Sequence, residues 1–93
     1  MILNSSFLFV SNKISEGKSV ANSHGMQKVL VLLKHQDTHY VVLHDDSTGS
    51  MYIEKVKSII RPDLYVSDNF EKIDNDEEWT AIYNILRSNG INL

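Results

Sequence analysis

The chain has 93 residues, with nine Lys and Arg against twelve Asp and Glu, no Cys, one Pro and 42% apolar residues. This length leaves room for one hydrophobic core, so we expect a single domain over residues 1–93 and exclude large multilayer enzymes. The lack of cysteine rules out a disulfide framework, a zinc–thiolate site and a thiol nucleophile, and we expect a cytoplasmic protein. No apolar run approaches the roughly 20 residues that span a bilayer, so no membrane segment is predicted.

The amino-terminal part of the chain combines one apolar run with a polar stretch. Phe7-Leu8-Phe9-Val10 predicts a buried strand. Residues 11–24 show no sustained periodicity, and we interpret them as a long loop with at most a short turn of helix. Within this stretch, Glu16-Gly17-Lys18-Ser19 matches the end of a phosphate-binding P-loop. The first glycine of that motif is missing and the chain is too short for the usual nucleotide-binding sheet, so a plain surface loop is the preferred interpretation.

The run from 27 to 46 predicts a β-hairpin, because two apolar segments flank the polar residues 35–39. Its first strand is apolar at both odd and even positions. Such a strand is typical of the centre of a sheet that is covered on both faces.

The segment after the hairpin is harder to assign from periodicity. Residues 45–50 are turn formers, and we expect a third strand of the meander over 51–54. The apolar spacing then favours a helical turn over 55–60, ended by Arg61-Pro62. Leu64-Tyr65-Val66 is compatible with a short strand.

The carboxyl-terminal segment predicts an amphipathic helix. Asp74, followed three residues later by Glu77, has the spacing of a capping box, so the helix should begin near Asn75. Gly90 suits the helix end. Five apolar residues form the expected buried stripe: Trp79, Ile82, Tyr83, Ile85 and Leu86. The predicted fold is therefore α+β, a small meander-like antiparallel sheet of three to five strands with this helix packed on one face.

Three histidines in the hairpin suggest two kinds of chemistry. His35, His39 and His44 are metal-ligating residue types, but alternation along a strand separates them. Only a three-residue loop over 36–38 would place His35 and His39 on one face. With Lys34 and Tyr40, the same histidines could form an acid–base set of the kind used by metal-independent ribonucleases. The net charge of −3 disfavours an enzyme that must hold a polyanion. No enzyme activity, metal or cofactor is predicted.

The charge distribution is the most informative feature of the sequence. Residues 1–61 carry a formal charge of +2 and residues 62–93 carry −5. Charges gathered within about 8 Å create a local field that attracts basic partners, although acids at a helix amino terminus also have a purely structural role. The predicted partner-binding residues are the seven acids of this region: Asp63, Asp68, Glu71, Asp74, Asp76, Glu77 and Glu78.

These observations favour a binding protein without catalytic activity. We expect it to bind a macromolecule, most plausibly a basic protein, and to inhibit or neutralise it, as immunity proteins, antitoxins and bacteriophage-encoded inhibitors do. That comparison rests on a shared profile of short, acidic, cysteine-free chains.

Two further alternatives stay open. The first is RNA binding through a thin basic face with stacking tyrosines, formed by Lys55, Lys57, Arg61, Tyr52 and Tyr65. The second is a homodimer, which is expected if one helix does not cover both faces of so apolar a sheet.

Overall fold

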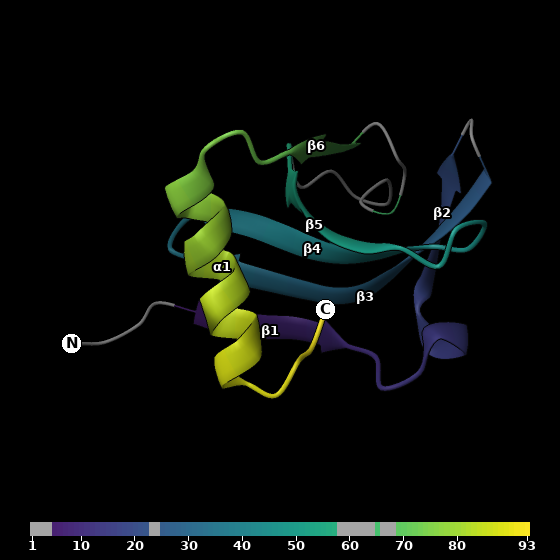
Figure 1. Cartoon of the computed structure of the whole chain (residues 1–93), viewed down its shortest axis with the longest axis horizontal. Coiled ribbons are helices and arrows are strands. Elements are labelled where there is room, and N and C mark those ends of the chain that lie inside the picture. The colour runs from purple at the N-terminus through teal and green to yellow at the C-terminus, as the bar shows by residue number, and fades with distance from the viewer. Residues whose placement is uncertain (1–4, 23–24, 58–64, 66–68) are drawn as a thin grey trace.

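The computed structural model describes residues 5–22, 25–57, 65 and 69–93. The described part is an α+β fold, as predicted, in which one helix lies across an antiparallel sheet (Figure 1). The elements in chain order are β1 (Ser5–Val10), a 3-10 turn (Ile14–Glu16), β2 (Lys18–Asn22), β3 (Gly25–His35), β4 (Thr38–Asp45), β5 (Met51–Val56), β6 (Phe70–Lys72) and α1 (Asp76–Ser88).

The predicted hairpin is confirmed and forms the centre of the sheet. β3 and β4 pair antiparallel, with His35 opposite Thr38, so the loop between them is the two residues Gln36 and Asp37. Gln36 has a positive φ of 57°, a conformation that tight hairpin turns require. β5 and then β6 extend the meander on the far side of β4.

The other edge of β3 is shared by two short strands. β1 pairs with the carboxyl-terminal half of β3, and β2 pairs with its amino-terminal half. The loop predicted over residues 11–24 is therefore wrong over residues 18–22, although its short helical turn is present at Ile14–Glu16. The sequence of β2 has little strand character of its own. Its register is supplied by the eleven-residue β3, which extends past the end of β1.

A bulge at Leu30 divides the side chains of β3 between two cores. The pairing of β3 with β4 shifts between Val29 and Val31, so Leu30 and Val31 both contact the core under α1, whereas Val29 contacts the opposite one. Residues 29–33 are all buried. The prediction of a central strand covered on both faces is confirmed.

The first core lies between the sheet and α1. It contains Leu30, Val31, Leu33, Tyr40, Val42, Ile53, Ile82 and Leu86. Ile82 and Leu86 are both 0% exposed, and burying two such side chains contributes about 3–6 kcal/mol.

The second core lies on the opposite face of the sheet. It contains Val20, Val29, Leu32, Val41, Leu43, Val56 and Phe70. Val20 belongs to one edge of the sheet and Phe70 to the other edge. The cluster therefore extends across the sheet, and the partly buried rings of Phe9, Tyr52 and Tyr65 pack against it.

The helix begins where its cap is formed. Asn75 is the N-cap, and its side-chain oxygen accepts a 2.8 Å hydrogen bond from the backbone N–H of Glu78. The helix start near Asn75 is therefore confirmed, but the capping pair is Asn75 and Glu78 instead of Asp74 and Glu77. At 13 residues, α1 is too short to cross a bilayer, and no other described helix is longer.

The segment after β4 departs from the prediction in two places. Lys55 and Val56 continue β5 instead of starting a helical turn, because Lys55 pairs with both Tyr40 and Glu71. Residues 58–60 lie outside the described part. Tyr65 is in a 3-10 conformation and not in a strand, while Leu64 and Val66 are not described. The three-residue β6 was not predicted.

Candidate partner-binding surface

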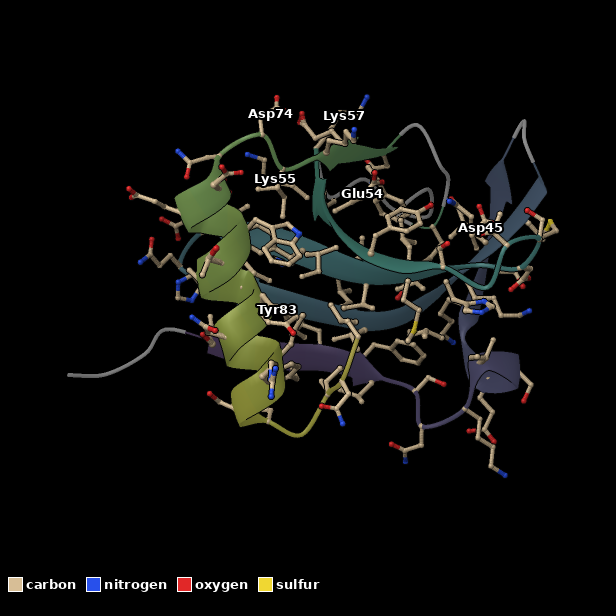
Figure 2. All side chains as sticks on the ribbon, in the orientation of Figure 1. Asp45, Glu54, Lys55, Lys57, Asp74 and Tyr83 are labelled. Atoms are coloured by element: carbon tan, nitrogen blue, oxygen red, sulfur yellow. The ribbon has the colours of Figure 1, made fainter. Side chains whose placement is uncertain are left out.

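Four of the seven predicted acids are exposed in the structure, and we call this set the acidic surface. It consists of Glu71, Asp74, Asp76 and Glu77. Glu71 lies on β6, Asp74 lies on the segment that leads into α1, and the other two lie in the first helical turn (Figure 2). Among the described residues, none of these four carboxylates has a hydrogen-bond or ion-pair partner. Asp63 and Asp68 lie outside the described residues.

The seventh acid, Glu78, is held by the sheet. Its carboxylate accepts a 2.6 Å hydrogen bond from the Tyr40 hydroxyl, and the Lys55 ammonium lies 3.4 Å from the same oxygen. Glu78 precedes Ile82 by four residues, which places it on the buried side of the helix. That spacing is visible in the sequence and could have separated Glu78 from the other acids. We therefore leave Glu78 out of the acidic surface.

The hydrogen bond to Glu78 alters the chemistry of Tyr40. Burial, together with the hydrogen bond and the negative charge of Glu78, raises the pKa of Tyr40 to about 12. The hydroxyl is thus a fixed donor at neutral pH and is not a candidate acid or base. Its effect is structural, since it joins the first turn of α1 to β4 and holds the acidic surface at a defined place on the sheet.

One aromatic residue of the predicted buried stripe lies at the surface instead. Trp79 is 38% exposed and belongs to neither core. Its ring stacks on Tyr83, with centroids 5.0 Å apart and an angle of 12° between the planes. The helical spacing of Trp79 and Ile82 is compatible with a shared buried face. In the structure Ile82 is fully buried and Trp79 is not.

The three hairpin histidines are separated. The two-residue loop sets His39 opposite Lys34, so His39 and Lys34 lie on the face opposite His35 and Tyr40. This arrangement divides the predicted acid–base set. Within the described ranges, no three His, Asp or Glu side chains are close enough to hold a metal ion. Burial, followed by the charge of Lys34, lowers the pKa of His39.

Each of the other two histidines has a local partner. The Nδ1 atom of His35 lies 2.9 Å from the Ser5 hydroxyl. The Nδ1 atom of His44 lies 2.9 Å from a carboxylate oxygen of Asp46, which also pairs with Lys28 at 2.8 Å.

The P-loop resemblance has a structural explanation. Lys18 and Ser19 begin β2, so no helix follows Gly17 as the phosphate-binding motif requires. A Cβ atom on Gly17 would lie 2.9 Å from the Leu30 side chain and 3.0 Å from the Val29 carbonyl oxygen. Gly17 is thus required because the chain passes closely over the β3 bulge.

The residues of the predicted RNA-binding face have other contacts. Lys55 pairs with Glu78, and Tyr52 and Tyr65 pack against the second core. The Tyr52 hydroxyl also accepts a hydrogen bond from the Gln27 amide. Lys57 is exposed, and Arg61 lies outside the described residues.

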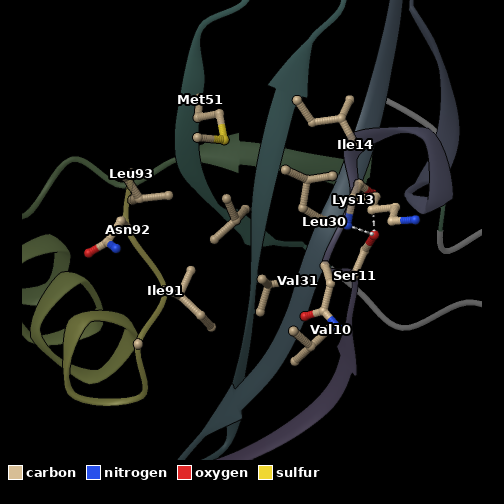
Figure 3. A pocket seen from close by; sticks show the side chains of 13 residues that line it. Val10, Ser11, Lys13, Ile14, Leu30, Val31, Met51, Ile91, Asn92 and Leu93 are labelled. Atoms are coloured by element: carbon tan, nitrogen blue, oxygen red, sulfur yellow. Dashed lines mark hydrogen bonds between the residues drawn. The ribbon is translucent and has the colours of Figure 1, made fainter.

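A groove of about 300 Å³ with a mixed polar and apolar lining lies between the carboxyl-terminal tail and the loop after β1 (Figure 3). Its exposed walls include Val10, Ile14, Met51 and Leu93, and its floor includes Leu30 and Val31. Lys13 is the one charged residue that lines it. Residues 90–93, which line the groove, follow the carboxyl-terminal end of α1, whereas Asp76 and Glu77 lie in its first turn.

Comparison of the chain with models of protein families, with curated proteins and with solved structures finds no match.

Proposed function

We propose that this chain is a binding protein without catalytic activity, which docks on a basic surface of another protein through the acidic surface and inhibits or neutralises it. The observation that carries the proposal is the lack of internal partners for Glu71, Asp74, Asp76 and Glu77 among the described residues. Acids already paired inside a fold contribute little to an encounter, whereas unpaired exposed acids steer a basic partner and are screened by salt.

The rigidity of the platform supports the same proposal. The cap at Asn75, the contact of Glu78 with Tyr40 and the buried side chains of Ile82 and Leu86 fix the first turn of α1 on the sheet. Acids held in place lose little conformational freedom when a partner binds. The positive end of the helix dipole also lowers the electrostatic cost of placing these acids close together.

The composition of the chain supports one class of binding protein. A short, acidic, cysteine-free chain fits an immunity protein, an antitoxin or a bacteriophage-encoded inhibitor that acts in the cytoplasm. RNA binding has less support, because Lys55 is paired with Glu78 and the two tyrosines pack against a core.

The structure changes which surface a homodimer would use. Both core clusters are buried within one chain, so an uncovered sheet face no longer argues for a second copy. The groove lined by Val10, Ile14, Met51 and Leu93 is the apolar surface on which a second copy would have to pack.

A pair of charge-matched variants tests the proposed function. Asp76→Asn/Glu77→Gln removes two charges from the acidic surface, and Glu16→Gln/Asp37→Asn removes two exposed charges elsewhere. Tagged wild-type and variant proteins are used to capture proteins from a nuclease-treated lysate of the source cell at several salt concentrations. We expect a basic protein that is captured by the wild type and the control variant, is lost with the Asp76/Glu77 variant and is released by salt. Equal capture by all three proteins would reject the acidic surface as the binding site.

A further inference from the structure

Three residues at four-residue intervals form a continuous stack along α1, which we call the aromatic ladder: Trp79, Tyr83 and Arg87. The Trp79 and Tyr83 rings are nearly parallel at 5.0 Å. The Arg87 guanidinium lies 5.8 Å from the centre of the Tyr83 ring, and its Nη1 donates a 3.3 Å hydrogen bond to the Tyr83 hydroxyl. Figure 2 shows Tyr83, the middle member, on α1. The ladder thus already holds one arginine at its carboxyl-terminal end.

The amino-terminal end of the ladder is Trp79. Trp79 is 38% exposed, whereas Tyr83 is partly buried against the first core. Stacking on Tyr83 covers one face of the indole. A group that docks on Trp79 from solvent therefore meets the parts of the ring that Tyr83 does not cover. A large aromatic side chain left in water on a rigid helix is the kind of anchor that protein interfaces use.

The charges around Trp79 specify which group would cover it. Asp76 precedes Trp79 by three residues and is its neighbour on the helix surface. Among the described residues Asp76 has no ion-pair partner, while the nearby ammonium of Lys55 pairs with Glu78. The face of an indole attracts cations more strongly than that of any other aromatic side chain. The complementary group is therefore a cation that can lie on the ring and reach a carboxylate.

We propose that Trp79 is the residue through which this protein recognises an arginine of its partner. The guanidinium lies on the face of the indole turned away from Tyr83, pairs with Asp76 and extends the stack that Arg87 begins at the other end. Arginine is favoured over lysine because a planar guanidinium stacks on an aromatic ring and binds a carboxylate through two N–H groups at once. This inference rests on the proposed function and adds to it the chemistry of the recognised side chain.

Trp79 is the sole tryptophan of the chain, so its fluorescence reports directly on the site. The intact protein is titrated at low salt with nona-arginine and, separately, with nona-lysine. We expect nona-arginine to change the Trp79 emission in a saturable manner and to bind at least about threefold more tightly than nona-lysine.

Two variants separate this inference from the proposed function. Affinities of dye-labelled peptides are measured for Trp79→Leu, for Asp76→Asn/Glu77→Gln and for the control Thr80→Ala, an exposed neighbour on α1. Circular dichroism checks that each variant is folded. Trp79→Leu should lose the part of the arginine preference that stacking on the ring supplies, so the ratio of the two affinities should fall below that of the wild type while the acids still bind both peptides. Thr80→Ala should behave as the wild type.

The possible failures are distinct. If Trp79→Leu keeps the full wild-type preference for arginine, or if saturating nona-arginine leaves the Trp79 emission unchanged, the arginine-recognition proposal is rejected. The acidic surface stands in that case, provided that Asp76→Asn/Glu77→Gln weakens binding of both peptides. If the Asp76/Glu77 variant binds both peptides as tightly as the wild type, the proposed function itself fails.

Discussion

The Tyr40 hydroxyl donates a 2.6 Å hydrogen bond to the Glu78 carboxylate, across 38 residues of sequence. This contact joins the central hairpin to the first turn of α1. Tyr40 is 4% exposed, and Glu78 also pairs with Lys55 on β5. Glu78 thereby fixes the orientation of the acidic segment on the sheet, and its exposed acidic neighbours remain available to bind a partner.

Tyr40→Phe should destabilise the fold while keeping its shape. The substitution removes one charge-assisted hydrogen bond and leaves Glu78 partly desolvated, which costs about 1–3 kcal/mol. Urea unfolding followed by circular dichroism measures the free energy of unfolding. Tyr83→Phe is the matched control, since the Tyr83 hydroxyl contacts only the exposed Arg87, and it should cost less than about 0.5 kcal/mol. Equal losses of unfolding free energy in the two variants would show that the hydrogen bond to Glu78 stabilises the fold no more than the contact of Tyr83 with Arg87 does.

Tyr40→Phe should also change how the free energy of unfolding depends on pH in the alkaline range. Because the pKa of Tyr40 is raised to about 12 by burial and by Glu78, the folded protein keeps this proton at a pH where the unfolded chain releases it. The stability due to Tyr40 is fully present below pH 10, the ordinary pKa of tyrosine, and is lost as the pH rises toward 12. The difference in unfolding free energy between wild type and Tyr40→Phe should therefore shrink over this interval. A constant difference would contradict the assigned protonation state.

Glu54→Gln should make the protein slightly more stable at neutral pH. Glu54 lies opposite Val41, on the sheet face of the second core, where burial raises its pKa and the charge of Lys72 only partly opposes that effect. A raised carboxyl pKa means that ionisation disfavours the fold, and the penalty disappears below the ordinary pKa of 4.5. We expect a gain of up to about 0.5 kcal/mol at pH 7 that vanishes below pH 4.5. Thermal unfolding at several pH values measures it, and a loss of stability at pH 7 would show that the pair with Lys72 dominates.

Gly17→Ala tests why a glycine stands before β2. The added methyl group would lie 3.0 Å or less from atoms of Leu30, Lys28 and Val29. Part of this contact is backbone, which cannot move aside cheaply, so we expect a loss of about 1–3 kcal/mol. Ser19→Ala, two residues further along and exposed on β2, should have almost no effect. Chemical denaturation of the two variants compares them, and an unchanged stability for Gly17→Ala would mean that β2 can shift away from the bulge.

The candidate site was only partly accessible from the sequence. The acid-rich segment and the helix that carries it follow from composition and from the spacing of Ile82 and Leu86. The exposure of Trp79 does not follow, because helical spacing places it beside Ile82 on the apolar side. The separation of His35 from His39 depended on the length of one turn, which the polar residues 35–39 leave open.

The sequence by itself determined the elements whose information is local: the β3–β4 hairpin, whose strands are apolar enough to be buried on both faces, and the helix from Asn75, whose cap and apolar stripe lie within a few turns. The tertiary structure alone decided β2 and β6, because these short polar strands are ordered by pairing with β3 and β5 and have no strong preference of their own. It also decided which groups Glu78 contacts, because Tyr40 and Lys55 are distant from it in the chain and meet it only in the folded protein.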